Sequence, residues 1–94
     1  MNFKVKKATV LGSGVMGSGI ACHLANVGID VLMLDIQPKD KSIKNRNIIA
    51  DDALNYAIKS KPNPLYKKEY ASRITTGNFD DDFEKINDAD WIIE

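Results

Sequence analysis

The sequence predicts an α/β protein built on a doubly wound parallel sheet. Two short apolar runs, 8–11 and 31–34, do not alternate in polarity, which is typical of strands buried on both faces. A glycine-rich turn and a stretch with helical periodicity separate these runs. The order strand, helix, strand within about thirty residues indicates a right-handed parallel βαβ unit.

The first helix is expected to begin after the glycine turn and to end near Gly28. Met16, Ile20, Leu24 and Val27 recur at spacings of four, four and three, which predicts one buried face of this helix. Gly28 is suited to end the helix because glycine readily takes the left-handed conformation of a helix C-cap.

The connection between the second and third strands is long. From Asp35 to Ile74 there are 39 residues by subtraction, whereas a plain crossover needs only about a dozen. The range 42–61 predicts a helix that Pro62 breaks, and 65–71 predicts a second short helix. We interpret this segment as a helical excursion between strands 2 and 3, although a merely longer crossover fits the spacing equally well.

The rest of the chain completes the first four strands of a Rossmann-like sheet in one domain, 1–94. The elements expected are a third strand at 74–76 ended by Gly77, a short helix at 80–86, and a fourth strand at 91–93 with Glu94 at its carboxyl end. Phe83 and Ile86 are expected to face inward from the short helix. Trp91 is expected to pack in the core rather than to serve as a platform for a cofactor.

Composition limits the partners of the chain. Thirteen basic and thirteen acidic residues give a net charge of zero, so we expect neither nucleic acid nor a membrane surface as a partner. The apolar runs are too short for a membrane span. Cys22 is the only cysteine and has only His23 beside it, which excludes an internal disulfide and a zinc-type metal site. A reducing, cytoplasmic setting is expected, and both residues are interpreted as ordinary helix residues.

The six residues 12–17, Gly-Ser-Gly-Val-Met-Gly, form a turn suited to a dinucleotide. A pyrophosphate must come close to backbone N–H groups at the positive end of a helix. Gly12 permits the tight turn, Gly14 leaves the phosphates unobstructed, and Gly17 lets the helix pack against the strand. The amides of the first helical turn can then donate to phosphate oxygens. The residues expected to bind the cofactor are Gly12, Ser13, Gly14, Val15, Met16, Gly17 and Asp35.

Asp35 ends the second strand, 18 residues after Gly17 and near the spacing of about twenty expected for a ribose-binding acid. Its carboxylate can accept hydrogen bonds from the adenosine ribose and repels a 2′-phosphate, so it favours NAD over NADP. Lys39 and Lys41 could tolerate that phosphate, but they lie several residues beyond the strand. FAD, whose sites use the same fingerprint, and a turn shaped by glycines without any ligand are the alternatives.

Residues 9–21, Thr-Val-Leu-Gly-Ser-Gly-Val-Met-Gly-Ser-Gly-Ile-Ala, resemble the opening of the L-3-hydroxyacyl-CoA dehydrogenases. The resemblance is closest to the dehydrogenase part of the bifunctional enzymes that are fused to an enoyl-CoA hydratase. Methionine before the third glycine, with Gly19-Ile20-Ala21 behind it, is typical of that family. The ranges 31–35, 73–77 and 89–94 resemble its second, third and fourth strands.

The resemblance implies an NAD-binding N-terminal domain in which Gly12, Gly14 and Gly17 line the pyrophosphate and Asp35 binds the ribose. It implies a full-length enzyme that oxidises a 3-hydroxyacyl-CoA to the 3-ketoacyl-CoA in fatty-acid β-oxidation, or the reverse, with the excursion helping to hold the acyl-CoA. The family's catalytic histidine and its glutamate partner lie further along, as does the helical domain that completes the CoA site and usually the homo-oligomer. We therefore expect no catalytic residue within 1–94 and no activity from these residues alone.

Two other functions are compatible with the residues. Another NAD-dependent β-hydroxyacid dehydrogenase with a similar loop would act on a free acid, and the long excursion argues against it. A non-catalytic nucleotide-sensing module would explain the lack of a base. Against it, a sheet that stopped at 91–93 would be half built, with an uncharged strand at its edge.

Overall fold

The computed structural model describes residues 5–61 and 63–93, so the expectations for Pro62 and Glu94 lie outside the described residues. Its strands form one four-stranded sheet in the order β3-β2-β1-β4, and every pairing is parallel. The elements are β1 (Lys7–Leu11), α1 (Val15–Asn26), β2 (Asp30–Asp35), α2 (Ile48–Lys59), η1 (Lys68–Arg73), β3 (Ile74–Asn78), α3 (Phe79–Asp82), η2 (Phe83–Asp88) and β4 (Trp91–Ile93). The predicted Rossmann-like α/β fold with a helical excursion after the second strand is therefore confirmed.

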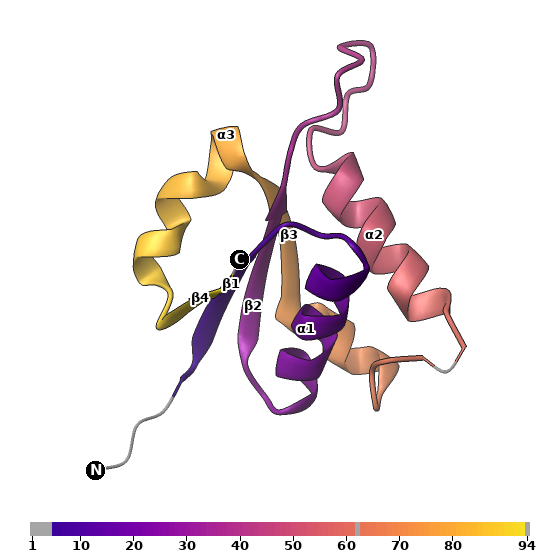
Figure 1. The fold of residues 1–94 in the computed structure, drawn as a ribbon, viewed down its shortest axis with the longest axis vertical. Helices are drawn as coiled ribbons and strands as arrows, with labels where there is room; N and C mark the ends of the chain where they lie inside the picture. Colours follow the sequence, from indigo (N-terminus) through magenta and orange to yellow (C-terminus); the bar gives the residue numbers. More distant parts are fainter. Residues whose placement is uncertain (1–4, 62, 94) are drawn as a thin grey trace.

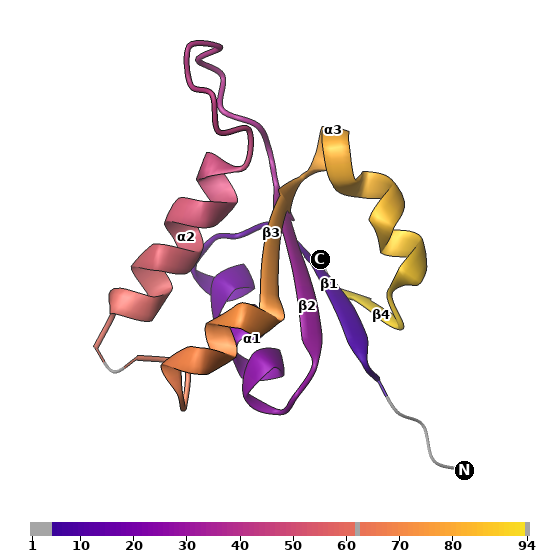
Figure 2. The ribbon, with the colours of Figure 1, turned by 180° about the vertical axis from the view of Figure 1, so that it is seen from behind.

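The helices divide between the two faces of the sheet. Figure 1 shows α1 and α2 on one side of the strands and the α3–η2 segment on the other, and the view from behind in Figure 2 agrees. A right-handed crossover from β1 through α1 to β2 places that helix against the sheet, as expected for a parallel βαβ unit. Among the described residues, none of the helices has the length and apolar character that crossing a membrane requires.

The core lies between α1 and the central strands. Apolar strand residues pack there against small residues of the helix; the buried set includes Ala8, Val10, Ala21, Cys22, Ala25, Val31, Met33 and Ile74. Small side chains let the helix lie close to the strands. The predicted helical stripe was wrong at both ends, since Met16 and Val27 are 80% and 61% exposed. Met16 lies in the first turn and Val27 follows the last helical residue, so neither belongs to the face that packs on the sheet.

The excursion contains less helix than the sequence predicts. α2 begins at Ile48 rather than at residue 42, because side chains before it bond to nearby backbone in turns. The Ser42 amide donates to the Asp40 carboxylate at 2.9 Å, and the Asn47 amide donates to the Asn45 side chain at 3.0 Å.

The second predicted helix of the excursion, 65–71, is replaced by the shorter η1, 68–73. Asn26 at the end of α1 explains the difference. Its side-chain amide donates to the Pro64 carbonyl at 2.9 Å, and its side-chain oxygen accepts from the Tyr66 amide at 2.9 Å. These bonds fix residues 64–66 outside a helix.

The end of the chain also differs in detail. β3 continues through Gly77 to Asn78 instead of ending at the glycine. Phe83 was predicted to face inward but is 49% exposed, because its neighbour Asp82 takes the buried position and accepts the Asn78 amide at 3.0 Å. Trp91 was predicted to be core but is 51% exposed, since β4 is the edge strand of the described sheet and pairs only with β1 there.

β4 is held to the start of β1 by Asp90. Its carboxylate accepts the backbone amides of Lys6 and Lys7 at 2.9 and 3.1 Å, and its own amide donates to the Lys7 carbonyl at 2.8 Å. These backbone bonds hold the pKa of Asp90 below its usual range. Two segments more than eighty residues apart in sequence are joined in this way.

Candidate functional site

The glycine turn lies at the carboxyl end of β1, between that strand and α1. Gly12 has φ +102°, a conformation that residues with a side chain rarely adopt, and its amide donates to the Leu34 carbonyl at 2.8 Å. The turn is therefore anchored to β2 while the chain changes direction. α1 then begins with Gly14 as its N-cap, and no side chain caps the helix. Its first amides are left to bind an anion.

Gly17 and Gly14 serve different purposes in this turn. A Cβ on Gly17 would lie 2.0 Å from the Gly12 carbonyl oxygen, which confirms that the absence of a side chain allows the helix to pack against the turn. A Cβ on Gly14 would meet no heavy atom within 4 Å. The space beside Gly14 is thus open, as a bound phosphate requires.

Asp35, at the end of β2, lies directly against the glycine turn. Its Oδ2 accepts the Ser13 amide at 2.8 Å and also the Ser13 hydroxyl, and its Oδ1 accepts the Ile36 amide at 2.7 Å. Burial alone would raise the pKa of Asp35, but the hydrogen bonds from the Ser13 hydroxyl and the two amides outweigh it and lower the pKa below the ordinary carboxyl value. The carboxylate is therefore ionised at neutral pH. It lies beside the glycine turn, as the sequence predicts.

The surface on both sides of the turn is apolar. Val15 and Met16 are strongly exposed and line one hollow together with Gly12, Gly14 and Ile20. A second groove runs between α1 and α2; its lining includes Gly14, Ser18, Ala53, Tyr56, Ala57 and Pro64. Exposed apolar side chains beside backbone amides are typical of a site for a ligand with both charged and flat apolar parts.

The sequence predicts that Cys22 and His23 are ordinary helix residues, and their places in the structure agree with this prediction. Cys22 is fully buried in the core, and burial raises the pKa of its thiol, so it is not a reactive thiolate. His23 is exposed near the last turn of α1, away from the glycine turn at the other end of that helix.

Comparison with known proteins decides the family. The sequence model of the family described as "3-hydroxyacyl-CoA dehydrogenase, NAD binding domain" matches residues 7–94. The chain therefore belongs to the NAD-binding domain family of the 3-hydroxyacyl-CoA dehydrogenases. Its cofactor is NAD, as the sequence predicted.

Relatives agree with this assignment. A provisionally named 3-hydroxyacyl-CoA dehydrogenase of Bacillus subtilis is 48% identical over the whole chain, which covers 13% of that protein. One of Deinococcus radiodurans is 45% identical over 97% of the chain and 26% of its own length. A provisionally named fatty acid oxidation complex trifunctional enzyme of Rickettsia felis is 44% identical over the whole chain and 13% of its length. The chain thus spans about an eighth to a quarter of the curated relatives it matches.

A solved structure shares the fold. The crystal structure of (S)-3-hydroxybutyryl-CoA dehydrogenase PaaH1 from Ralstonia eutropha superposes on 95% of the chain with a TM-score of 0.55. The two sequences are 23% identical, and the match covers 30% of the PaaH1 chain. This likeness supports the Rossmann-like architecture of the NAD-binding domain.

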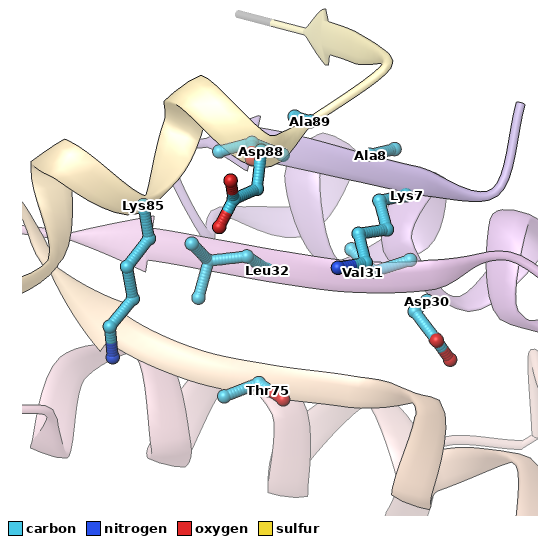
Figure 3. Close-up of a pocket in the computed structure, with 10 residues that line it drawn as sticks. Lys7, Ala8, Asp30, Val31, Leu32, Thr75, Lys85, Asp88 and Ala89 are labelled. Atoms are coloured by element: carbon cyan, nitrogen blue, oxygen red, sulfur yellow. The ribbon is translucent and has the colours of Figure 1, made fainter.

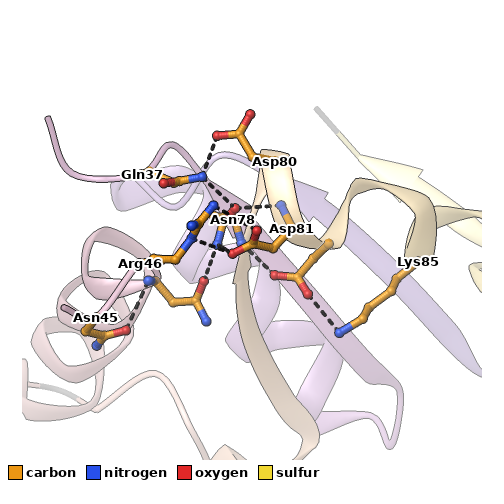
Figure 4. A network of polar contacts seen from close by, with 9 residues as sticks. Gln37, Asn45, Arg46, Asn78, Asp80, Asp81 and Lys85 are labelled. Atoms are coloured by element: carbon orange, nitrogen blue, oxygen red, sulfur yellow. Dashed lines mark hydrogen bonds and ion pairs between the residues drawn. The ribbon is translucent and has the colours of Figure 1, made fainter. Parts of the chain in front are cut away.

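A polar network that the sequence did not reveal joins the loop after β2 to the end of β3 and α3 (Figure 4). The Gln37 side chain donates to Asp80 at 2.7 Å, and Arg46 forms an ion pair with Asp81 at 2.8 Å. Asn78, which is buried at the end of β3, donates to Asp81 at 2.9 Å. These bonds fix the loop that follows Asp35 against the turn between β3 and α3. The only sign of this network in the sequence was the number of Asn and Asp residues that follow the ends of β2 and β3.

A further hollow lies beneath η2 on the opposite face of the sheet (Figure 3). Leu32 and Thr75 line it from the sheet, and Lys85 and Asp88 line it from η2. It also reaches Asp30, at the amino end of β2, whereas the glycine turn follows the carboxyl end of β1. Ligands of open α/β sheets bind at the carboxyl ends of the strands, so this hollow is not part of the NAD site.

Proposed function

We propose that residues 12–17 and Asp35 hold NAD, with the glycine turn at the diphosphate and Asp35 at the adenosine ribose. The uncapped start of α1 and the open space beside Gly14 suit a diphosphate. The single observation that carries the proposal is the contact between Ser13 and Asp35, because it puts a carboxylate at the edge of the same turn. A ribose lies next to the diphosphate in NAD, so one short site can bind both groups.

We further propose that the whole protein oxidises a 3-hydroxyacyl-CoA to a 3-ketoacyl-CoA, or catalyses the reverse reaction, in fatty-acid β-oxidation. The names of the relatives support this activity. NAD, when bound, accepts the hydride from the substrate alcohol. The described residues contribute to this reaction by binding and orienting the cofactor. The family assignment argues against the free-acid dehydrogenase and the sensing module that the sequence left open.

The base that takes the alcohol proton is proposed to lie outside the described residues. Such a base must come within hydrogen-bond reach of the hydroxyl, and the exposed His23 lies near the far end of α1. We also propose that the helical domain that completes the CoA site, and the contacts between the subunits of a homo-oligomer, lie outside the described residues. A cytoplasmic location also stays a prediction.

The groove between α1 and α2 is proposed to hold part of the acyl-CoA. Tyr56 gives it an exposed aromatic side chain. Four exposed lysines follow along the chain, Lys59, Lys61, Lys67 and Lys68. CoA combines phosphates with an adenine ring and an apolar acyl chain. We propose that the lysines bind its phosphates and that the groove holds an apolar part.

Replacing Lys67 and Lys68 together by glutamate tests this placement in the complete protein. The KM for acetoacetyl-CoA should rise roughly fivefold for the loss of two exposed phosphate contacts. The KM for NADH should stay unchanged, because the lysines are remote from the glycine turn. Equal increases in the KM for acetoacetyl-CoA and in the KM for NADH would contradict this placement of the CoA.

Asp35→Ala tests the ribose role. We expect the Kd for NAD to rise about tenfold, since a hydrogen bond to a charged group is lost. The Kd for NADP should change little, because the same substitution also removes the charge that repels the 2′-phosphate. Calorimetric titration of both nucleotides measures the difference. Asp52→Ala, which removes an exposed carboxylate from α2, is the matched control. Equal weakening of NAD and NADP would contradict the assignment of Asp35.

A further inference from the structure

Ser13 differs from the other residues of the glycine turn in where its polar groups point. It is only 2% exposed, although Gly14 beside it is open to solvent. Its backbone amide and its hydroxyl both donate to the same atom, Oδ2 of Asp35. Neither group is directed at the surface where the diphosphate of NAD would lie. The sequence predicts Ser13 among the cofactor-binding residues, and its two donors are both directed at Asp35.

The hydrogen bonds leave one side of the Asp35 carboxylate available. An ionised carboxylate has about four lone-pair sites. Ser13 occupies two of them on Oδ2, and the Ile36 amide occupies one on Oδ1. The remaining acceptor site is on Oδ1. The protein thus presents one oxygen of the carboxylate to a ligand and holds the other in place.

We propose that Ser13 is a positioning residue that orients the Asp35 carboxylate for the adenosine ribose, so that Oδ1 accepts the ribose hydroxyl. This inference rests on the proposed ribose role of Asp35. Without the Ser13 hydroxyl, the carboxylate keeps only its backbone partners and gains freedom to rotate. NAD then has to order this side chain as it binds, which weakens the affinity.

The acidity of Asp35 provides an independent readout. The Ser13 hydroxyl is the largest of the hydrogen-bond contributions that lower the pKa of Asp35, and no charged side chain among the described residues contributes to the shift. Ser13→Ala should therefore raise this pKa toward the ordinary carboxyl value. Because the folded-state pKa is lowered, the bond stabilises the fold fully above the ordinary carboxyl pKa, and this stabilisation is lost as the pH falls through the folded pKa.

A double-mutant cycle in the complete protein tests the proposal. Ser13→Ala should raise the Kd for NAD roughly threefold, which is less than the loss expected for Asp35→Ala, because the carboxylate is kept and only has to be ordered on binding. It should cause no further loss when Asp35 is already alanine, because Ser13 acts only through the carboxylate. A direct phosphate contact predicts the opposite, namely the same loss in both backgrounds and for NADP as well. Equal losses in both backgrounds would overturn the proposal.

Two controls separate this result from a fault in folding. Ser42→Ala removes a serine hydroxyl that donates to the Asp40 carboxylate at 2.7 Å, outside the glycine turn, and it should leave the affinities for NAD and NADP unchanged. Ser13→Cys replaces the hydroxyl by a thiol, which is somewhat larger and only a weak donor, and it should reproduce the loss seen with alanine. A titration of the carboxylate by nuclear magnetic resonance, without nucleotide, should show the raised pKa of Asp35 in both Ser13 variants. An unchanged pKa would also overturn the proposal.

The cycle separates this inference from the proposed function. If the wild-type protein bound no NAD, or if Asp35→Ala left the affinity unchanged, the proposed ribose site itself would be wrong. If Asp35→Ala weakened binding but Ser13→Ala did not, only the positioning role would be lost.

Discussion

Gly17→Ala should destabilise the domain by about 1–2 kcal/mol, in spite of the higher helix propensity of alanine. The added Cβ would lie 2.0 Å from the Gly12 carbonyl oxygen, which is backbone and cannot rotate away. α1 has to move off the turn, and overpacking of this kind costs about 1–3 kcal/mol and occasionally more. Alanine returns only about 1 kcal/mol through its helix propensity. Urea denaturation should show a lower midpoint with an unchanged slope.

Gly19→Ala is the matched control for this prediction. Gly19 lies in the same helix, but a Cβ on it would meet no heavy atom within 4 Å. Only the propensity term remains, so this variant should be as stable as the wild type or more stable by about 0.5–1 kcal/mol. If Gly17→Ala behaved like Gly19→Ala, the close approach of α1 to the turn would be wrong.

Gly14→Val should abolish NAD binding while the fold persists. Gly14 has φ −58°, a negative value that residues with a side chain also adopt, and a Cβ there would meet no heavy atom within 4 Å, so we expect the fold to accept valine. The same side chain would occupy the space proposed for the diphosphate. Losing an amide–phosphate hydrogen bond costs about 1.5–3 kcal/mol, and two such losses raise the Kd at least roughly a hundredfold.

The two glycine variants together separate the fold from the site. Thermal unfolding of Gly14→Val should follow the wild-type curve, and its titration with NAD and with NADP should show no saturation. Gly17→Ala should lower both the stability and the affinity. NAD affinity retained by Gly14→Val would move the diphosphate away from this turn, whatever the stability of the variant.

The glycine turn, the βαβ unit and Asp35 could be predicted because their signals are local in the sequence. A positive φ restricts Gly12 to glycine, and β2 ends at an acid whose position follows from the spacing. The same holds for Cys22, whose size suits the closely packed face of α1. In each case, the property that produces the structure belongs to the residue itself or to its neighbours along the chain.

The remaining details depend on contacts between distant segments. Asn26 holds Tyr66 outside a helix through a bond across forty residues, and no local pattern shows this. Asp82 takes the buried position that Phe83 was expected to take, because an amide of β3 needs its carboxylate. The hydrogen bond from Ser13 to Asp35 has the same origin, since the two residues lie 22 positions apart in the sequence. A sequence pattern identifies apolar residues but not which polar residue satisfies a buried backbone group.

The place of β1 in the sheet has a consequence for biosynthesis. β1 is translated before the other strands of the described sheet, yet it lies between two of them, and the later one, β4, pairs Trp91 with Ala8. The backbone groups on one side of β1 therefore stay unpaired until residues 91–93 have been translated. During that interval this side of β1 is an unpaired strand edge that can mispair with other chains. Pairing with β4 closes the edge, and the bonds from the Lys6 and Lys7 amides to Asp90 hold the two strands together at one end.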